Sequence, residues 1–146
     1  MINQLVRINN SLSKLSRKFH GLAPFIDHLE ITDAPHLAVA GTDGRRLMFN
    51  LQWVQSLSDE QLDGLVMHEI IHVIDAHIER AEDRALTVWN SACDIRSNYV
   101  LRNIELPVPQ GTTDNPAYDA MDIEDIYEDL MSQINLITRF TQENIE

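Results

Sequence analysis

Two histidines and a glutamate stand close together in the segment His68-Glu69-Ile70-Ile71-His72. On a helix, His68 and His72 are about 40° apart around the axis, so both imidazoles can reach one zinc ion. Glu69 is displaced by about 100° from the first histidine, where its carboxylate can face the open position of the metal and accept a proton from water. The segment therefore predicts a hydrolytic zinc site with Glu69 as general base.

A zinc site with two histidines needs a third protein ligand, and two side chains are candidates. On an unbroken helix His77 points about 180° from His68, and neither Gly nor Pro lies between Ile74 and His77 to break the helix. Asp94 comes from a later predicted helix and is free of this restriction. We expect Asp94 to be the ligand and His77 to be exposed or to lie behind the ligands. His77 remains the alternative third ligand.

The segment around Asp94 carries two further polar side chains. Asn90, Asp94 and Asn98 recur every four residues, so they fall within an arc of about 80° on one helix. Three short polar groups beside Trp89 are typical of a hydrogen-bonded interior network. We expect Asn98 to orient a metal ligand, and Asn90 either to do the same or to contact the substrate. Cys93 lies 100° from Asp94 and is interpreted as a small buried residue.

Two helices and a hairpin are predicted to position these residues. Residues 58–80 form the motif helix in this interpretation, because Ser58 to Gln61 make a capping box and apolar residues follow at helical spacing. Residues 85–102 form the helix of Asp94. The apolar runs 36–40 and 46–50 flank an Asp-Gly pair, which predicts a β-hairpin.

The rest of the chain predicts more helix than strand. Further helices are expected over residues 3–19, 24–31 and 122–138. A length of 146 residues suits one domain. We expect a mostly helical α+β domain over 1–146, with a helical region over 1–33 and a core over 34–146. Within the core, the small sheet packs on the motif helix.

The charge is distributed unevenly along the chain, and this distribution limits the kinds of partner that we expect the chain to bind. The chain carries −12 in total, while residues 1–20 carry +4, which leaves −16 on the remainder. An acidic body repels nucleic-acid backbones, and no apolar run is long enough to cross a membrane, so we expect neither partner. The acidic surface instead suits a protein partner. The basic start is interpreted as a surface helix docked on the acidic body, with an organelle transit peptide as the alternative.

The cysteine content bears on the cell compartment. The chain has one cysteine, which excludes an internal disulfide and a cysteine-rich zinc site and favours a reducing compartment. We expect the cytoplasm of a bacterial or phage-infected cell.

Beyond the motif itself, the sequence over about residues 35–130 resembles a family of bacterial and phage metallopeptidase domains. The resemblance implies a zincin-like fold with the motif helix under a small sheet. Members often precede a von Willebrand A-like domain, which this sequence does not hold, and often neighbour MoxR-type ATPases. The matching pieces are the His68–His72 motif with His77 and Arg80, the set Trp89, Asn90, Ala92, Asp94 and Asn98, the loop ending at Gly111, Tyr118-Asp119 and residues 123–130.

The expected activity is zinc-dependent hydrolysis of peptide bonds. Tyr118 and His77 are candidates for an additional donor to the oxyanion, and neither is preferred. The strand near 45–50 is expected to pair with an extended peptide substrate by strand addition. Two alternatives remain: a module that zinc only stabilises and that binds a protein, and a metal hydrolase acting on other substrates.

Overall fold

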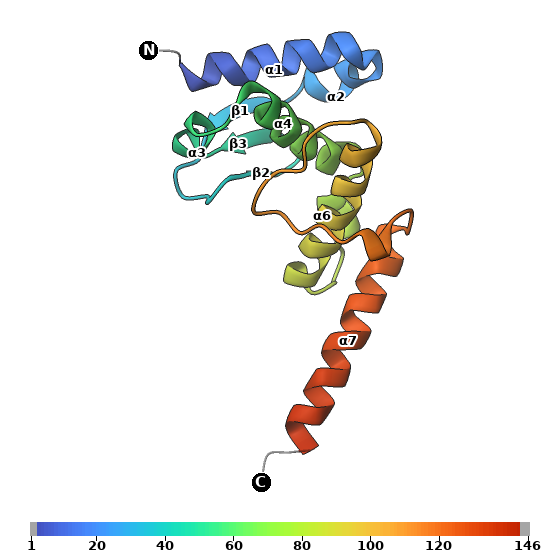
Figure 1. The fold of residues 1–146 in the computed structure, drawn as a ribbon. Coiled ribbons are helices and arrows are strands. Elements are labelled where there is room, and N and C mark those ends of the chain that lie inside the picture. Colours follow the sequence, from blue (N-terminus) through green and yellow to red (C-terminus); the bar gives the residue numbers. More distant parts are fainter. Residues whose placement is uncertain (1–2, 144–146) are drawn as a thin grey trace.

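The computed structural model describes residues 3–143 and has the mixed α+β architecture expected from the sequence (Figure 1). Helices cover and flank one small sheet. The helices are α1 (Gln4–Lys18), α2 (Ala23–Ile26), α3 (Leu51–Gln55), α4 (Asp59–Ile74), α5 (His77–Arg80), α6 (Leu86–Asn103) and α7 (Ile123–Glu143), and the strands are β1 (Glu30–Asp33), β2 (Ala40–Thr42) and β3 (Arg46–Phe49).

The sheet has the order β1-β3-β2, with β3 parallel to β1 and antiparallel to β2. The predicted hairpin is present, and the Asp43 carboxylate closes its turn by accepting hydrogen bonds from the backbone N–H groups of Arg45 and Arg46. Two expectations are wrong. Residues 30 and 31 belong to strand β1 rather than to the end of the predicted helix 24–31, and β3 is the central strand. Because both edges of β3 are already paired, a substrate cannot add to the segment 45–50.

Helix α4 begins where the sequence predicts. The Ser58 side chain accepts a hydrogen bond from Gln61 N–H, and the Gln61 side chain accepts one from Ser58 N–H. These two bonds satisfy donors that every helix start leaves unpaired. The helix then runs through the interior, with residues 62–71 all buried. It packs against α1, α6 and the edge strand β2, and so it is the central element of the fold.

Two apolar clusters make up the interior. The first cluster joins α1, the sheet and α4, with Ile8, Leu47, Phe49 and Ile70 fully buried. The second cluster joins α6 to the start of α7; its buried members are Ala81, Trp89, Ala92, Cys93, Ile95, Tyr118, Ile123, Ile126 and Tyr127. The motif helix thus belongs to the first cluster, while most of α6 belongs to the second.

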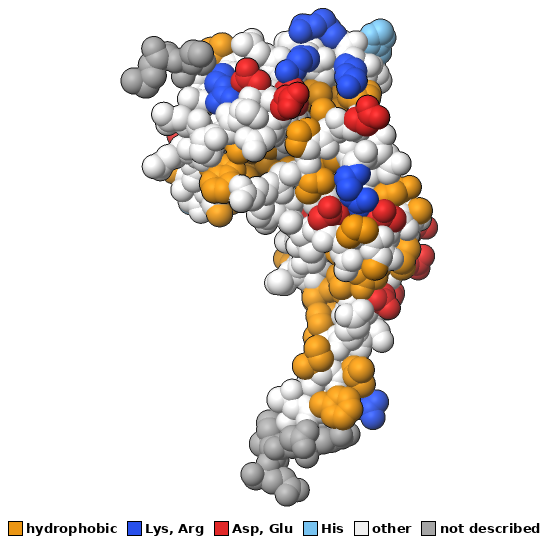
Figure 2. Space-filling model, in the orientation of Figure 1, with side chains coloured by type: hydrophobic (Ala, Val, Ile, Leu, Met, Phe, Trp, Pro, Cys, Tyr) orange, Lys and Arg blue, Asp and Glu red, His pale blue; other side chains and the backbone are white. Residues whose placement is uncertain are grey.

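The basic N-terminal segment docks on the acidic body as expected. Arg7 pairs with Asp59, and Lys14 pairs with Asp63, whose carboxylate also accepts a hydrogen bond from Ser11. The cations of α1 are visible at the top of Figure 2. At the other end, α7 runs five residues beyond its predicted end and projects away from the body (Figure 1). No helix within residues 3–143 is both long and apolar enough to cross a membrane.

The predicted motif helix is interrupted before residue 80. Helix α4 ends at Ile74, Ala76 adopts a left-handed conformation with φ of 51°, and α5 starts at His77. The left-handed conformation costs a non-glycine residue about 1–2 kcal/mol. Contacts on both sides hold the break: Arg80 donates to the carbonyl of Asp75, and the Trp89 indole N–H donates to the carbonyl of His77. The expectation of an unbroken helix over 58–80 is therefore wrong.

Helix α4 needs a glycine where the loop after α6 crosses it. A Cβ atom on Gly64 would lie 2.1 Å from the carbonyl oxygen of Pro107, and backbone cannot swing aside as a side chain can. We expect Gly64→Ala to lower the free energy of unfolding by about 3 kcal/mol or more, because this overlap outweighs the roughly 1 kcal/mol that alanine gains in a helix. Denaturant unfolding measures the change.

The matched control is Gly21→Ala. A Cβ atom on Gly21 would meet nothing within 4 Å, so its unfolding free energy should stay within about 0.5 kcal/mol of wild type. A Gly64→Ala protein as stable as the control would show that Pro107 does not approach α4 this closely.

Candidate metal centre

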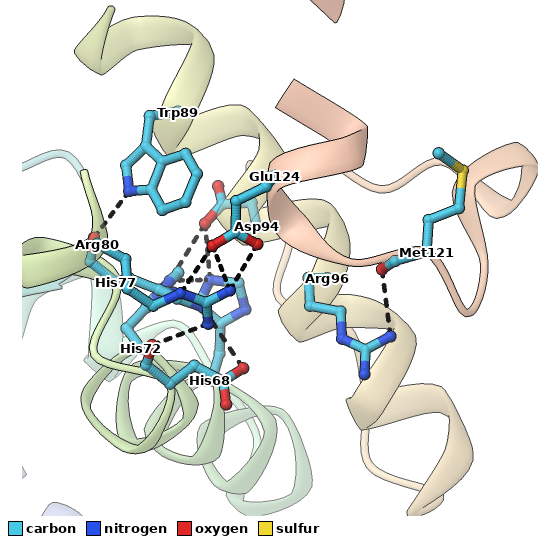
Figure 3. A network of polar contacts seen from close by, with 10 residues as sticks. His68, His72, His77, Arg80, Trp89, Asp94, Arg96, Met121 and Glu124 are labelled. Atoms are coloured by element: carbon cyan, nitrogen blue, oxygen red, sulfur yellow. Dashed lines mark hydrogen bonds and ion pairs between the residues drawn. The ribbon is translucent and has the colours of Figure 1, made fainter. Parts of the chain in front are cut away.

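Three side chains from two helices bring donor atoms to one point. His68 and His72 lie one turn apart on α4, and Asp94 reaches them from the adjacent α6 (Figure 3). Asp94 Oδ1 lies 3.1 Å from His68 Nε2 and 3.2 Å from His72 Nε2, and the two Nε2 atoms are 3.0 Å apart. The three groups are the one set in residues 3–143 whose donor atoms cluster as metal ligands do.

The donor set fits a tetrahedral metal ion. With metal–ligand bonds of about 2.0–2.2 Å, the ligand atoms of a tetrahedral zinc site lie about 3.3–3.6 Å from one another. The observed separations of 3.0–3.2 Å fall a few tenths of an ångström short of that spacing. Two imidazole nitrogens and one carboxylate oxygen are also the donors that zinc binds in hydrolytic sites, where a fourth position is left open. The residues present therefore suit a zinc ion.

The other face of His68 shows which ring nitrogen is free to bind. Asn98 is fully buried, and its amide N–H groups donate to Thr112 Oγ1 at 3.0 Å and to the carbonyl of Thr113 at 2.8 Å. These bonds turn the amide oxygen toward His68 Nδ1, 3.0 Å away. When the ring proton of His68 is on Nδ1, this N–H donates to the amide oxygen, and the Nε2 lone pair is then directed at the convergence point. Asn98 thus lies where it can orient a ligand.

A comparison with known families places this cluster in context. Residues 5–142 match the sequence pattern of a family described as a putative metallopeptidase domain. The chain belongs to this family. No curated protein and no solved structure matches it.

The metallopeptidase-family match spans both helices of the cluster, where the ionised Asp94 carboxylate favours a cation. Burial opposes ionisation of Asp94, but hydrogen bonds from His68 and His72 hold its pKa well below the usual range. Burial alone would lower the pKa of His68, yet the bond to Asp94 and the nearby Glu69 raise it. In His72 burial prevails and lowers the pKa to about 4. A neutral His72 and an ionised Asp94 are the forms that bind a metal.

Glu69 lies beside the cluster and is almost completely buried, with 5% of its surface exposed. Burial raises the pKa of its carboxyl to about 7, with His68 opposing the rise. A group whose pKa is near the working pH exchanges protons most effectively. Glu69 lines the same cleft as the three metal-ligand candidates, so its carboxyl can exchange protons with a ligand bound there.

The cleft has a volume of about 580 Å³ and gives a ligand access to the cluster. Residues 38–42, which include β2, line the cleft together with residues of α5 and of the first turns of α6. Because β2 pairs only with β3 in the described part of the chain, its outer edge is unpaired. Apolar side chains, among them Val39, Ile78 and Leu86, line the walls, and polar groups gather at the cluster. The contribution of residues 38–42 to the cleft was not predicted from the sequence.

Of the other predicted site residues, Asn90 lies at the cleft and Tyr118 does not. Asn90 is exposed and lines the cleft beside Asp94, where a substrate can reach it. Tyr118 is not among the residues that line the cleft. It belongs to the second apolar cluster, and its hydroxyl donates to Asp129 at 2.6 Å. This position does not support Tyr118 as a candidate donor to the oxyanion.

His77 is buried and contacts His72, which corrects its expected direction. The break at Ala76 turns His77 back toward the cluster, so the two Nδ1 atoms lie 2.5 Å apart (Figure 3). His77 is 4% exposed and lies behind His72, away from the convergence point of the three donors. Cys93 is buried as predicted, and burial raises the pKa of its thiol to about 12.

Proposed function

We propose that this chain is a zinc-dependent peptidase of zincin-like type. The observation that carries the proposal is the convergence of His68, His72 and Asp94 in an open cleft, with Glu69 buried beside them. Membership of the metallopeptidase family supports the same class of reaction. When bound, zinc would polarise the peptide carbonyl and lower the pKa of water.

In this proposal the chain's own residues bind the substrate and move the proton. The unpaired edge of β2 can hold an extended peptide by backbone hydrogen bonds, and the apolar walls suit its side chains. Glu69 accepts a proton from the attacking water as the water oxygen bonds to the carbonyl carbon. The same carboxyl then delivers that proton to the amine nitrogen as the C–N bond breaks.

Metal loading and turnover of the whole chain test the proposal together. Purified without a metal-binding tag, the protein should hold about one zinc per chain. It should cleave members of a peptide library, lose that activity on chelation, and regain it with one equivalent of zinc. Elemental analysis and mass spectrometry of the products provide the measurements.

Other outcomes separate the alternatives. A protein that takes up no zinc would refute the metal site. Zinc uptake without cleavage of any peptide would favour a zinc-stabilised binding module, and hydrolysis of nucleotides but not peptides would favour another hydrolase.

A further inference from the structure

The metal-ligand candidate His72 has two ring nitrogens in different surroundings. Its Nε2 atom faces His68 Nε2 and Asp94 Oδ1 at the convergence point. Its Nδ1 atom faces His77 Nδ1 at 2.5 Å. His77 Nε2 is buried without a hydrogen bond in the described structure and faces Asp75 Oδ2 at 3.5 Å. The side chains thus form a row: Asp75, His77, His72 and the metal position.

The position of each proton follows from the use of His72 as a ligand. To bind a metal, Nε2 must present a lone pair, so the ring proton of His72 lies on Nδ1. Two nitrogens 2.5 Å apart need one proton between them, so His77 Nδ1 must accept it. The proton of His77 then lies on Nε2, which faces the Asp75 carboxylate. Every ring nitrogen in the row thereby has a role.

The backbone is built so that His77 occupies this place. Without the left-handed residue Ala76, α4 would continue and turn His77 to the opposite side of the helix. The Trp89 indole N–H donates to the His77 carbonyl at 2.7 Å, which anchors the first residue of α5 independently of the imidazole. The strained turn and the anchor both fix the ring behind His72.

We propose that His77 is a positioning residue that accepts the Nδ1 proton of His72, holds the Nε2 lone pair toward the metal, and is itself oriented by Asp75. The proposal rests on the metal site of the proposed function. Ligand-bound histidines commonly donate their second N–H to a carboxylate or carbonyl, and loss of such a partner lowers metal affinity about 10–100-fold. Here a second imidazole takes that place.

Substitutions at His77 test whether hydrogen-bond acceptance is what matters. Measured with a competing chelator, the zinc affinity of His77→Ala should fall about 10–100-fold. His77→Asn should stay within about threefold of wild type, because its amide oxygen can replace Nδ1 as acceptor. His20→Ala, which removes an exposed histidine, is the control and should change nothing. If His77→Asn loses as much affinity as His77→Ala, acceptance of a hydrogen bond is not what His77 supplies, and the proposal is wrong.

Nitrogen NMR of the intact zinc-loaded protein provides a readout that a structural role would not change. Two-bond proton–nitrogen spectra of ¹⁵N-histidine protein should show His72 protonated on Nδ1 and His77 protonated on Nε2. Zinc on His72 Nδ1 would overturn the proposal. The two hypotheses fail separately: absence of zinc in the wild type refutes the metal site, whereas zinc binding that His77→Ala leaves unchanged refutes only the role of His77.

Discussion

Glu69→Gln should give a folded, zinc-loaded protein that hydrolyses its peptide about 10²–10⁴-fold more slowly than wild type. Glutamine keeps the size of the side chain but cannot take a proton from water. The metal content should not change, because the three converging donors come from other residues. The stability should hold as well, since an uncharged amide replaces a carboxyl whose ionisation burial already disfavours. Steady-state kinetics with elemental analysis measure both effects.

A matched control for Glu69→Gln is Glu79→Gln, which alters an exposed glutamate on α5. This variant should retain full activity. If Glu69→Gln cleaves as fast as the control, Glu69 is not the base. If it loses zinc, the lowered rate reports on the metal site and not on proton transfer.

Asp94→Ala should lower the zinc affinity by more than about 100-fold. Loss of a residue that only hydrogen-bonds to a metal ligand lowers the affinity by up to about 100-fold, and loss of a ligand should have a larger effect. Asp94 supplies the one carboxylate oxygen among the three donors, and its carboxyl lies within 3.2 Å of both histidines. Without it, two neutral imidazoles would hold the ion, and two protein ligands are fewer than zinc sites use. Competition with a chromophoric chelator measures the affinity.

Asn90→Ala is the control for Asp94→Ala, because Asn90 lies one turn earlier on α6 and is exposed at the cleft. It should bind zinc as wild type does. An Asp94→Ala protein with undiminished affinity, combined with loss of zinc in His77→Asn, would identify His77 as the third ligand.

Strong local signals explain which elements could be predicted. The capping box at Ser58 correctly marks the start of α4, and the Asp43-Gly44 turn correctly marks the hairpin. Strand β1 was missed because its partner β3 lies 16 residues further along the chain in a parallel pairing, and four residues carry too little periodicity to reveal it. The spacing of apolar residues indicates which face of a single helix or strand is buried. It does not indicate which strands pair with one another.

At the candidate site, too, local sequence signals predicted some positions correctly, while contacts between distant residues were missed. The spacing of Asp94 and Asn98 on one helix face was informative, because α6 is continuous and its phase can be calculated. The phase argument for His77 failed because contacts from Trp89 and Arg80, rather than a glycine or proline, hold the break before it. Tyr118 was misplaced because its partners lie on α7, whose packing no local pattern specifies.

The metal position lies between helices that belong to the two apolar clusters, so a bound metal would affect how the protein unfolds. His68 comes from the first cluster's helix, and Asp94 stands between Cys93 and Ile95 of the second. An ion bound by both would couple the unfolding of one cluster to that of the other, because neither helix could separate without releasing it. Metal loss would then make unfolding less cooperative, because the two clusters could lose their order one after the other.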